Sequence, residues 1–175
     1  MGSWCVLWGY SAARCLNCVD NPPKVERQAR SPVSAIPATP SHCPCGNLRP
    51  YADCCGRFHS GENADTPQQL MRARYGAFVL RLPDYLLASW HPDTRPETLD
   101  LADADQLRWL GLDIRSKQLG ASGLRARVEF IARYRENGGP VLMRHEISRF
   151  VREDGRWYYV DSEFPRPPAP FPDRR

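Results

Sequence analysis

Four cysteines that lie close together in the sequence could bind one metal ion. They occur in the segment CPCGNLRPYADCC as Cys43, Cys45, Cys54 and Cys55. A tetrahedral site needs four soft ligands at close range, and thiolates meet that need for zinc or for a single iron. Pro44 stiffens a turn between the first two sulfurs. If Cys54 and Cys55 lie in a helical turn, their side chains diverge by about 100 degrees and both reach the ion. The pattern predicts a metal cage.

Other uses of the same cysteines explain the pattern less well. A disulfide framework requires an oxidising compartment, and the sequence shows no export signal. A bond between the adjacent Cys54 and Cys55 would strain the backbone, and a thiol nucleophile would not need four copies. His42 and His59 flank the cluster, and either could replace one cysteine as a ligand. A redox role stays open as the alternative to metal binding.

The composition favours a globular protein without a membrane span. Of the 175 residues, 42% are hydrophobic and 25% are charged, and the mean hydropathy is −0.55. No apolar run approaches the ~20 residues of a transmembrane helix. The net charge of +4 is too small to indicate a nucleic-acid-binding protein by itself. With no export signal, the expected location is the cytoplasm.

Prolines separate a leader and a tail from the middle of the chain. The 17 prolines are concentrated in residues 22–50 and 165–172. This predicts a disordered leader over residues 1–41 and a Pro-rich tail over residues 165–175. The leader holds a second thiol pair, Cys15 and Cys18, but no further pair follows it at a zinc-finger distance. An alternative explanation of residues 1–41 is a start codon assigned too far upstream.

The middle of the chain starts with helical patterns and continues with strands. The stretch 66–69, TPQQ, combines an N-cap, a first-turn proline and a glutamine at the third position. A second helix is expected from Pro83 to His91, where Pro92 ends it, and a short one over 104–110. Alternating residues then predict strands from 112, over 124–134, over 141–151 and over 156–161. The order predicts an α+β domain with helices packed on a curved antiparallel sheet, which gives a cone with an open mouth.

These motifs resemble those of a known bacterial family. The loop CPCG followed by CC is similar to the SEC-C motif, found at the C-terminus of the translocase motor SecA. The segments TPQQLMRARYGAFVLRLPDYLLASWHP, WLGLDI, HEISRF and DGRWYYVDSE resemble the YchJ-like family over residues 42–164. The resemblance implies a small zinc-stabilised SEC-C module over 42–62 and a nuclear-transport-factor-2-like domain over 63–164. The biochemical role of that family is not established, and this chain lacks the second SEC-C module that some relatives carry.

Polar residues near the expected mouth of the cone are weak catalytic candidates. In strand 141–151, His145 and Arg149 share a face with apolar residues, where they need partners or a cavity. Enzymes of this fold class pair a histidine with a carboxylate for proton transfer. His91 or His145 could take that role, with carboxylates available at Asp84, Glu146 and Asp161. The alternative is that these residues cap helices or form surface ion pairs, which contribute little.

Two function classes follow from these features. In the first, the metal module docks on a protein partner, for which the resemblance suggests secretion chaperones, the ribosome or acidic lipid headgroups. A stripe formed by Arg125, Arg127, Arg133 and Arg135 could meet ribosomal RNA or an acidic partner, or simply be a solvated sheet face. In the second, the cone holds a lyase, isomerase or hydrolase site. The first is preferred because a closed four-ligand site is structural. By analogy with the fold class, the open sheet face could form a homodimer.

Overall fold

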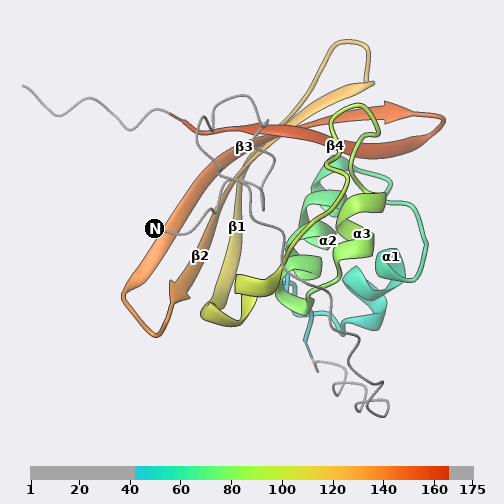
Figure 1. The fold of residues 1–175 in the computed structure, drawn as a ribbon. Coiled ribbons are helices and arrows are strands. Elements are labelled where there is room, and N and C mark those ends of the chain that lie inside the picture. Colours follow the sequence, from blue (N-terminus) through green and yellow to red (C-terminus); the bar gives the residue numbers. More distant parts are fainter. Residues whose placement is uncertain (1–41, 166–175) are drawn as a thin grey trace, which may run out of the picture.

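The computed structural model describes residues 42–165, in which helices precede a four-stranded sheet (Figure 1). The predictions made for the leader over 1–41, for Cys15 and Cys18, and for residues 166–175 lie outside the described residues. Within the described part, no helix is long and apolar enough to cross a bilayer.

The helices are short apart from one that starts with the expected capping box. They are η1 (Ala52–Gly56, a π-helical turn), α1 (Arg57–His59), α2 (Pro67–Leu80), α3 (Pro83–Ala88) and η2 (Ala102–Gln106, a 3-10 turn). At the start of α2, the Thr66 side chain accepts a hydrogen bond from the Gln69 amide, and the Gln69 side chain accepts one from the Thr66 amide. These bonds satisfy two backbone donors that would otherwise be unpaired, so the predicted capping box is confirmed.

The sheet is an antiparallel meander in the order β1-β2-β3-β4. The strands are β1 (Leu107–Leu119), β2 (Arg125–Glu136), β3 (Val141–Glu153) and β4 (Arg156–Glu163). Register shifts interrupt the β1–β2 pairing at two places and the β3–β4 pairing at one, and such bulges bend a sheet. Figure 1 shows the helices on one side of this sheet, with α2 packed on β1, β2 and β4. The predicted α+β fold is confirmed.

Side chains fill the space between α2 and the inner face of the sheet. Helix α2 contributes large buried residues such as Met71, Tyr75 and Phe78. The inner sheet face contributes Ala126, Val128, Phe130, Ala132, Ser148, Phe150, Trp157 and Tyr159. Aromatic rings in this core meet edge to face, as Trp90 and Tyr159 do at 4.9 Å between centroids. The centre of the cone is therefore a packed core.

The second helix is shorter than the sequence predicted. It ends at Ala88, and Trp90 forms a parallel bridge with Tyr159 at the edge of β4. The Tyr159 amide donates to the Ser89 carbonyl, and the His91 amide donates to the Tyr159 carbonyl. These bonds satisfy edge groups of β4, so pairing with the sheet outweighs another helical turn. Likewise, the helix expected over 104–110 is wrong beyond Gln106, because β1 begins at Leu107 and pairs with β2.

The orientation predicted for strand 141–151 is inverted. His145 and Arg149 were expected to face the interior, but they lie on the outer face, away from α2, with the exposed Met143. Glu146 and Ser148 lie on the inner face instead. The period of two fixes which residues share a face, but apolar residues on both faces left open which face is covered.

A carboxyl group is consequently buried inside the core. The Glu146 side chain is 0% exposed, and its Oε1 accepts a hydrogen bond from Arg144 Nη1 at 3.0 Å. Its Oε2 has no hydrogen-bond partner among the described residues. Burial raises the pKa of Glu146 to about 7, although Arg144 and the buried Arg74 act in the opposite direction. The folded protein therefore binds the proton of this group more tightly than the unfolded chain does.

We expect Glu146→Gln to become relatively more stabilising as the pH rises. Because the folded pKa of Glu146 is raised, its favourable contribution is complete below about pH 4.5 and is lost by about pH 7. Over that interval the wild type should lose about 3 kcal/mol of unfolding free energy relative to the glutamine variant. Urea unfolding at several pH values measures this difference, with the exposed Glu97→Gln as control. A pH-independent difference would contradict the burial of an ionisable carboxyl.

Candidate metal centre

The first two cysteines lie on a tight loop that a glycine makes possible. The Cys43 amide donates to the Arg49 carbonyl at 2.9 Å, and the Gly46 amide donates to the Cys43 carbonyl at 3.1 Å. Gly46 has φ +86, a left-handed conformation that residues with a Cβ rarely adopt. The loop holds the Cys43 and Cys45 sulfurs on the same side.

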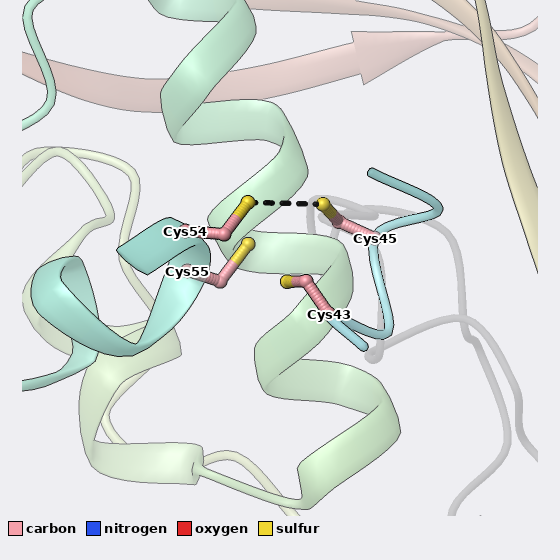
Figure 2. Close-up of side chains that lie close together, drawn as sticks. All are labelled: Cys43, Cys45, Cys54 and Cys55. Atoms are coloured by element: carbon pink, nitrogen blue, oxygen red, sulfur yellow. Dashed lines mark hydrogen bonds between the residues drawn. The ribbon is translucent and has the colours of Figure 1, made fainter. Parts of the chain in front are cut away.

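The second two cysteines lie on the π-helical turn η1. The Gly56 amide donates to the Tyr51 carbonyl at 2.8 Å, which closes the wider turn. Cys54 leaves helical geometry with φ −125 and ψ −107. The sequence suggested a regular helical turn here, but this local distortion is what points the adjacent Cys54 and Cys55 toward one place (Figure 2).

The four sulfurs have the spacing of a tetrahedral metal site. All four Sγ atoms lie within 4.8 Å of one another, and the Sγ atoms of Cys45 and Cys54 are 3.6 Å apart. A tetrahedron with metal–sulfur bonds of about 2.3 Å has sulfur–sulfur edges of about 3.8 Å. All four side chains are buried, and Asn47 Nδ2 donates to the Cys54 sulfur at 3.4 Å. The donor set therefore fits zinc or iron.

Burial and mutual hydrogen bonds oppose full ionisation of the four thiols. Hydrogen bonds from Cys45 and Cys55 lower the pKa of Cys43 to about 2. The same bond to Cys43 raises the pKa of Cys45 to about 12, and the bonds to Cys43 and Cys45, together with burial, raise the pKa of Cys55. Cys45 and Cys55 therefore hold their protons more strongly than exposed thiols do. A divalent cation would replace those protons and allow all four sulfurs to ionise.

The two flanking histidines are not part of the cluster. His59 Nδ1 lies 2.7 Å from the Tyr51 hydroxyl, and its Nε2 lies 2.9 Å from the Ala73 carbonyl. The carbonyl can only accept, so Nε2 donates and Nδ1 accepts, which leaves no lone pair for a metal. His42 is exposed and outside the four-sulfur group. The geometry therefore favours four cysteines over a mixed ligand set.

The cage packs directly on α2. Arg72 Nη1 donates to the Cys45 carbonyl at 2.8 Å, and the His59 bond to Ala73 reaches the middle of the same helix. At Gly76 an added Cβ would lie 3.5 Å from the Cys55 sulfur, so the helix backbone approaches the cage closely. The module and the α+β domain share one continuous hydrophobic core.

The weak catalytic candidates do not form one site. His145 Nε2 lies 2.7 Å from Glu129 Oε1, and the hydrogen bond from His145 is the main reason that the pKa of Glu129 is lowered. Arg149 binds both carboxylate oxygens of Asp161 through Nε and Nη2. His91 and Arg149 line one surface pocket together with residues of the β1–β2 hairpin, but His145 does not line it. From the sequence, Glu146 was expected only as a possible partner of a histidine, and Arg74 had no expected role. The position of Arg74 among the apolar residues of α2 was the signal that could have indicated its burial.

The predicted arginine stripe lies on the outer face of β2. Arg125, Arg127 and Arg133 are exposed. Arg127 Nη2 lies 3.4 Å from Glu163 Oε1, and Arg135 donates to the Gly139 carbonyl at 3.0 Å. Of the four arginines, Arg127 therefore has a partner on β4 and Arg135 has one in the β2–β3 turn.

Replacing Cys54 and Cys55 together by serine should remove the metal and destabilise the protein. Serine hydroxyls are poor zinc ligands, and a structural metal contributes folding free energy. We expect elemental analysis to find one zinc or iron per chain in the wild type and none in the variant, with a loss of more than about 4 kcal/mol in unfolding free energy. The matched control is Cys15→Ser with Cys18→Ser. Metal loss in that control, and not in the first variant, would contradict the cage.

Gly56→Ala should damage the same site without touching a ligand. An added Cβ would lie 2.7 Å from the Tyr51 carbonyl oxygen, inside van der Waals contact. We expect a loss of about 2 kcal/mol in unfolding free energy and a lower metal content by elemental analysis. Gly76→Ala is the control, because its nearest contacts at 3.4–3.5 Å are ordinary. Equal metal content in both variants would show that the π-helical turn does not depend on Gly56.

Comparisons with known proteins agree with this architecture. Residues 66–162 match the family model of the YchJ middle NTF2-like domain. A UPF0225 protein of Xanthomonas campestris is 50% identical over 127 residues, covering 72% of this chain and 98% of that protein. A UPF0225 protein of Bordetella pertussis is 51% identical over 130 residues, covering 73% of this chain and 96% of that protein.

Two solved structures of SEC-C motif containing proteins have a similar fold. The solution structure from Rhodopseudomonas palustris is 36% identical with a TM-score of 0.59, covering 70% of this chain and 98% of that protein. The crystal structure from Psychrobacter arcticus is 31% identical with a TM-score of 0.61, covering 70% and 82%. This chain therefore belongs to the YchJ-like UPF0225 family of SEC-C motif proteins.

Proposed function

We propose that the four cysteines hold a structural zinc or iron ion and that the ordered SEC-C module is a docking surface for a protein partner. The observation that supports this most is that all four tetrahedral positions are supplied by buried sulfurs. A site with four protein ligands keeps no open position for an activated water. The ion would therefore serve by ordering the chain around it. Reduced thiols of this kind suit the cytoplasm.

The turn over residues 46–50 is the surface that the cage orders. Leu48 at its tip is 88% exposed, and Arg49 and Pro50 beside it are also exposed. Asn47 fixes the turn to the Cys54 sulfur, and the Arg49 carbonyl is bonded to the Cys43 amide. An apolar side chain on a preorganised turn loses little entropy on binding. The complementary partner surface has an apolar pocket with acidic groups near it to accept Arg49.

The similarity to SEC-C motif proteins makes the translating ribosome and the secretion machinery the first partners to test. A lipid surface is a different candidate, because exposed basic and apolar residues also suit acidic headgroups. With each of these candidate partners, the module would act by binding and would not need to catalyse a reaction.

A second candidate function is supported by Glu146. A carboxyl group with a pKa raised to about 7 by burial is typical of general acids and bases. Its Oε2 has no partner in the described part of the chain, and the buried Arg74 contributes positive charge to the same interior. A lyase, isomerase or hydrolase would need the core to open around Glu146. Turnover of a substrate that is lost in Glu146→Gln would support this candidate.

Photo-cross-linking from position 48 tests the docking proposal. With a photoreactive amino acid replacing Leu48 in living cells, we expect one discrete protein adduct, identified by mass spectrometry. The adduct should disappear when Cys54→Ser and Cys55→Ser are added, because the turn loses its support. Position 143 is the control, since Met143 is also exposed but lies on the outer face of β3. No adduct, an adduct that persists without the cage, or adducts with lipid alone would each overturn the proposal.

A further inference from the structure

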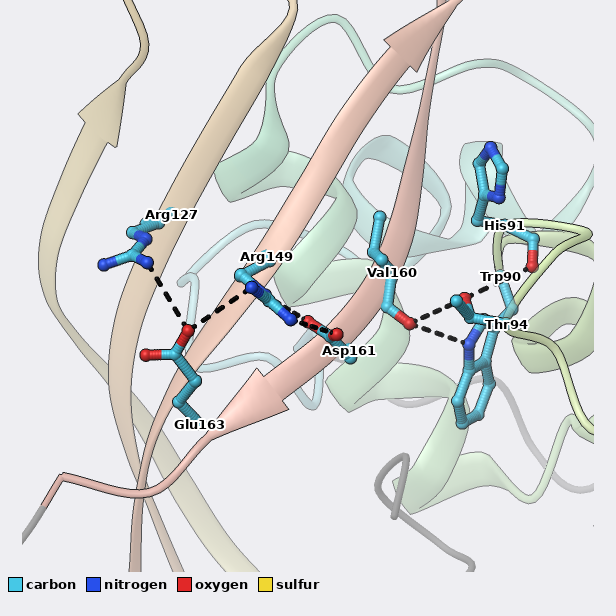
Figure 3. A network of polar contacts seen from close by, with 8 residues as sticks. All are labelled: Trp90, His91, Thr94, Arg127, Arg149, Val160, Asp161 and Glu163. Carbon is cyan, nitrogen blue, oxygen red and sulfur yellow. Dashed lines mark hydrogen bonds and ion pairs between the residues drawn. The ribbon is translucent and has the colours of Figure 1, made fainter. Parts of the chain in front are cut away.

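A hollow on the outer side of the sheet brings together charged and apolar groups from four separate segments. Figure 3 shows polar contacts of part of its lining, including Arg127, Arg149 and Thr94. The volume of the hollow is about 640 Å³, enough for a small organic molecule. The segments are the loop after α3, the β1–β2 hairpin, β3 and β4. None of the cage cysteines borders it. The hollow is therefore independent of the metal centre.

One wall of the hollow is made of three guanidinium groups. Arg127 and Arg149 are directly opposite each other on β2 and β3, and Arg125 precedes Arg127 on the same face of β2. Like charges in opposite positions of an antiparallel pair repel each other. Carboxylates next to them reduce this repulsion, and an anionic ligand would reduce it further.

The protein's own carboxylates neutralise this positive wall only in part. Glu163 Oε1 lies 3.4 Å from Arg127 Nη2 and 3.5 Å from Arg149 Nη1, longer than the 2.7–2.9 Å or so of a strong charge-assisted bond. Arg149 is held in place by Asp161. Arg125 makes no side-chain hydrogen bond or ion pair with any residue in 42–165 that the structure describes. Donors of Arg125 and Arg127 thus stay available for a carboxylate or phosphate group.

The opposite wall has a different chemical character. His91 Nδ1 accepts a hydrogen bond from the Asp93 amide at 3.2 Å, and its Nε2 lies 3.2 Å from Glu153 Oε1. The imidazole is therefore held as the tautomer that donates from Nε2. Thr94 Oγ1 donates to the Val160 carbonyl at 2.8 Å, and the Trp90 ring Nε1 donates to the same carbonyl at 3.1 Å. These hydrogen bonds hold the wall in place. The carboxylates of Asp93 and Glu153 in this wall would repel a second anionic group on a ligand.

Apolar side chains form the floor between the two walls. They are Leu119 at the end of β1, Val151 on β3 and Val160 on β4. A floor of this kind contributes affinity through the burial of carbon atoms, and the charged groups determine orientation. A fully hydrated ion such as inorganic phosphate would gain nothing from it.

We propose that this hollow binds a small organic molecule with one carboxylate or phosphate group on an apolar body. The acid group lies between Arg125 and Arg127, and Arg149 completes the positive wall. The apolar body covers Val151 and Val160. The end of the molecule near His91 and Glu153 carries no negative charge.

Titration by NMR with simple probes tests this proposal. The probes are phenyl phosphate, phenylacetate, inorganic phosphate and benzylamine, and the observed signals are the backbone amides of Thr94 and Gly120, both at the hollow. We expect saturable shifts with phenyl phosphate, phenylacetate or both. The stronger of the two identifies phosphate or carboxylate as the recognised group. Benzylamine and inorganic phosphate should bind at least about tenfold more weakly.

Matched variants connect binding to the arginines. Arg125→Ala with Arg127→Ala should weaken the best probe at least about tenfold, because it removes charge-assisted bonds. Arg115→Ala removes another outer-face arginine, one paired with Asp113 and outside the hollow, and should leave binding unchanged. Circular dichroism checks that both variants fold. Shifts that do not saturate, that follow benzylamine, or that survive the double substitution would overturn the proposal.

Discussion

The buried cluster of four thiols is the constraint on which the module depends. Four ionised sulfurs in such a small volume repel one another, and burial removes the water that would screen them. Protons or a divalent cation must therefore hold them together. A segment of about 20 residues cannot build an adequate core by itself. The module packs its sulfurs against α2, where Arg72 binds the Cys45 carbonyl and His59 binds the Ala73 carbonyl.

Features set by neighbouring residues could be predicted from the sequence. The cysteine spacing indicated the cage, and the stretch 66–69 indicated the start of α2, because a capping box and a thiolate turn are local. The strand predicted over 124–134 is found as β2 (Arg125–Glu136), since its alternation between small or apolar residues and arginines is regular. In each case the residues that decide the structure lie within a few positions of one another.

Features set by distant contacts could not be predicted in the same way. The end of α3 depends on β4, whose backbone binds the segment around Trp90 from about 70 residues further along the chain. The orientation of β3 depends on which face α2 covers, and alternation alone does not contain that information. The same inversion moved His145 and Arg149 to the outer face and Glu146 into the core. His145 and Arg149 therefore form surface ion pairs, whereas Glu146 is the buried carboxyl group.

Helix α2 connects the cage to the hollow through two arginines two positions apart. Arg72 binds the carbonyl of Cys45 on one side. Arg74 is buried on the other, where Nη1 donates to the Leu86 carbonyl and to Ser89 Oγ, and its guanidinium lies 4.1 Å from the Tyr159 ring. Cations near the last carbonyls of a helix stabilise its end. By fixing the end of α3, Arg74 sets where the chain joins β4, and that join places the His91 wall of the hollow. A single helix thus positions both surfaces, although they share no residue.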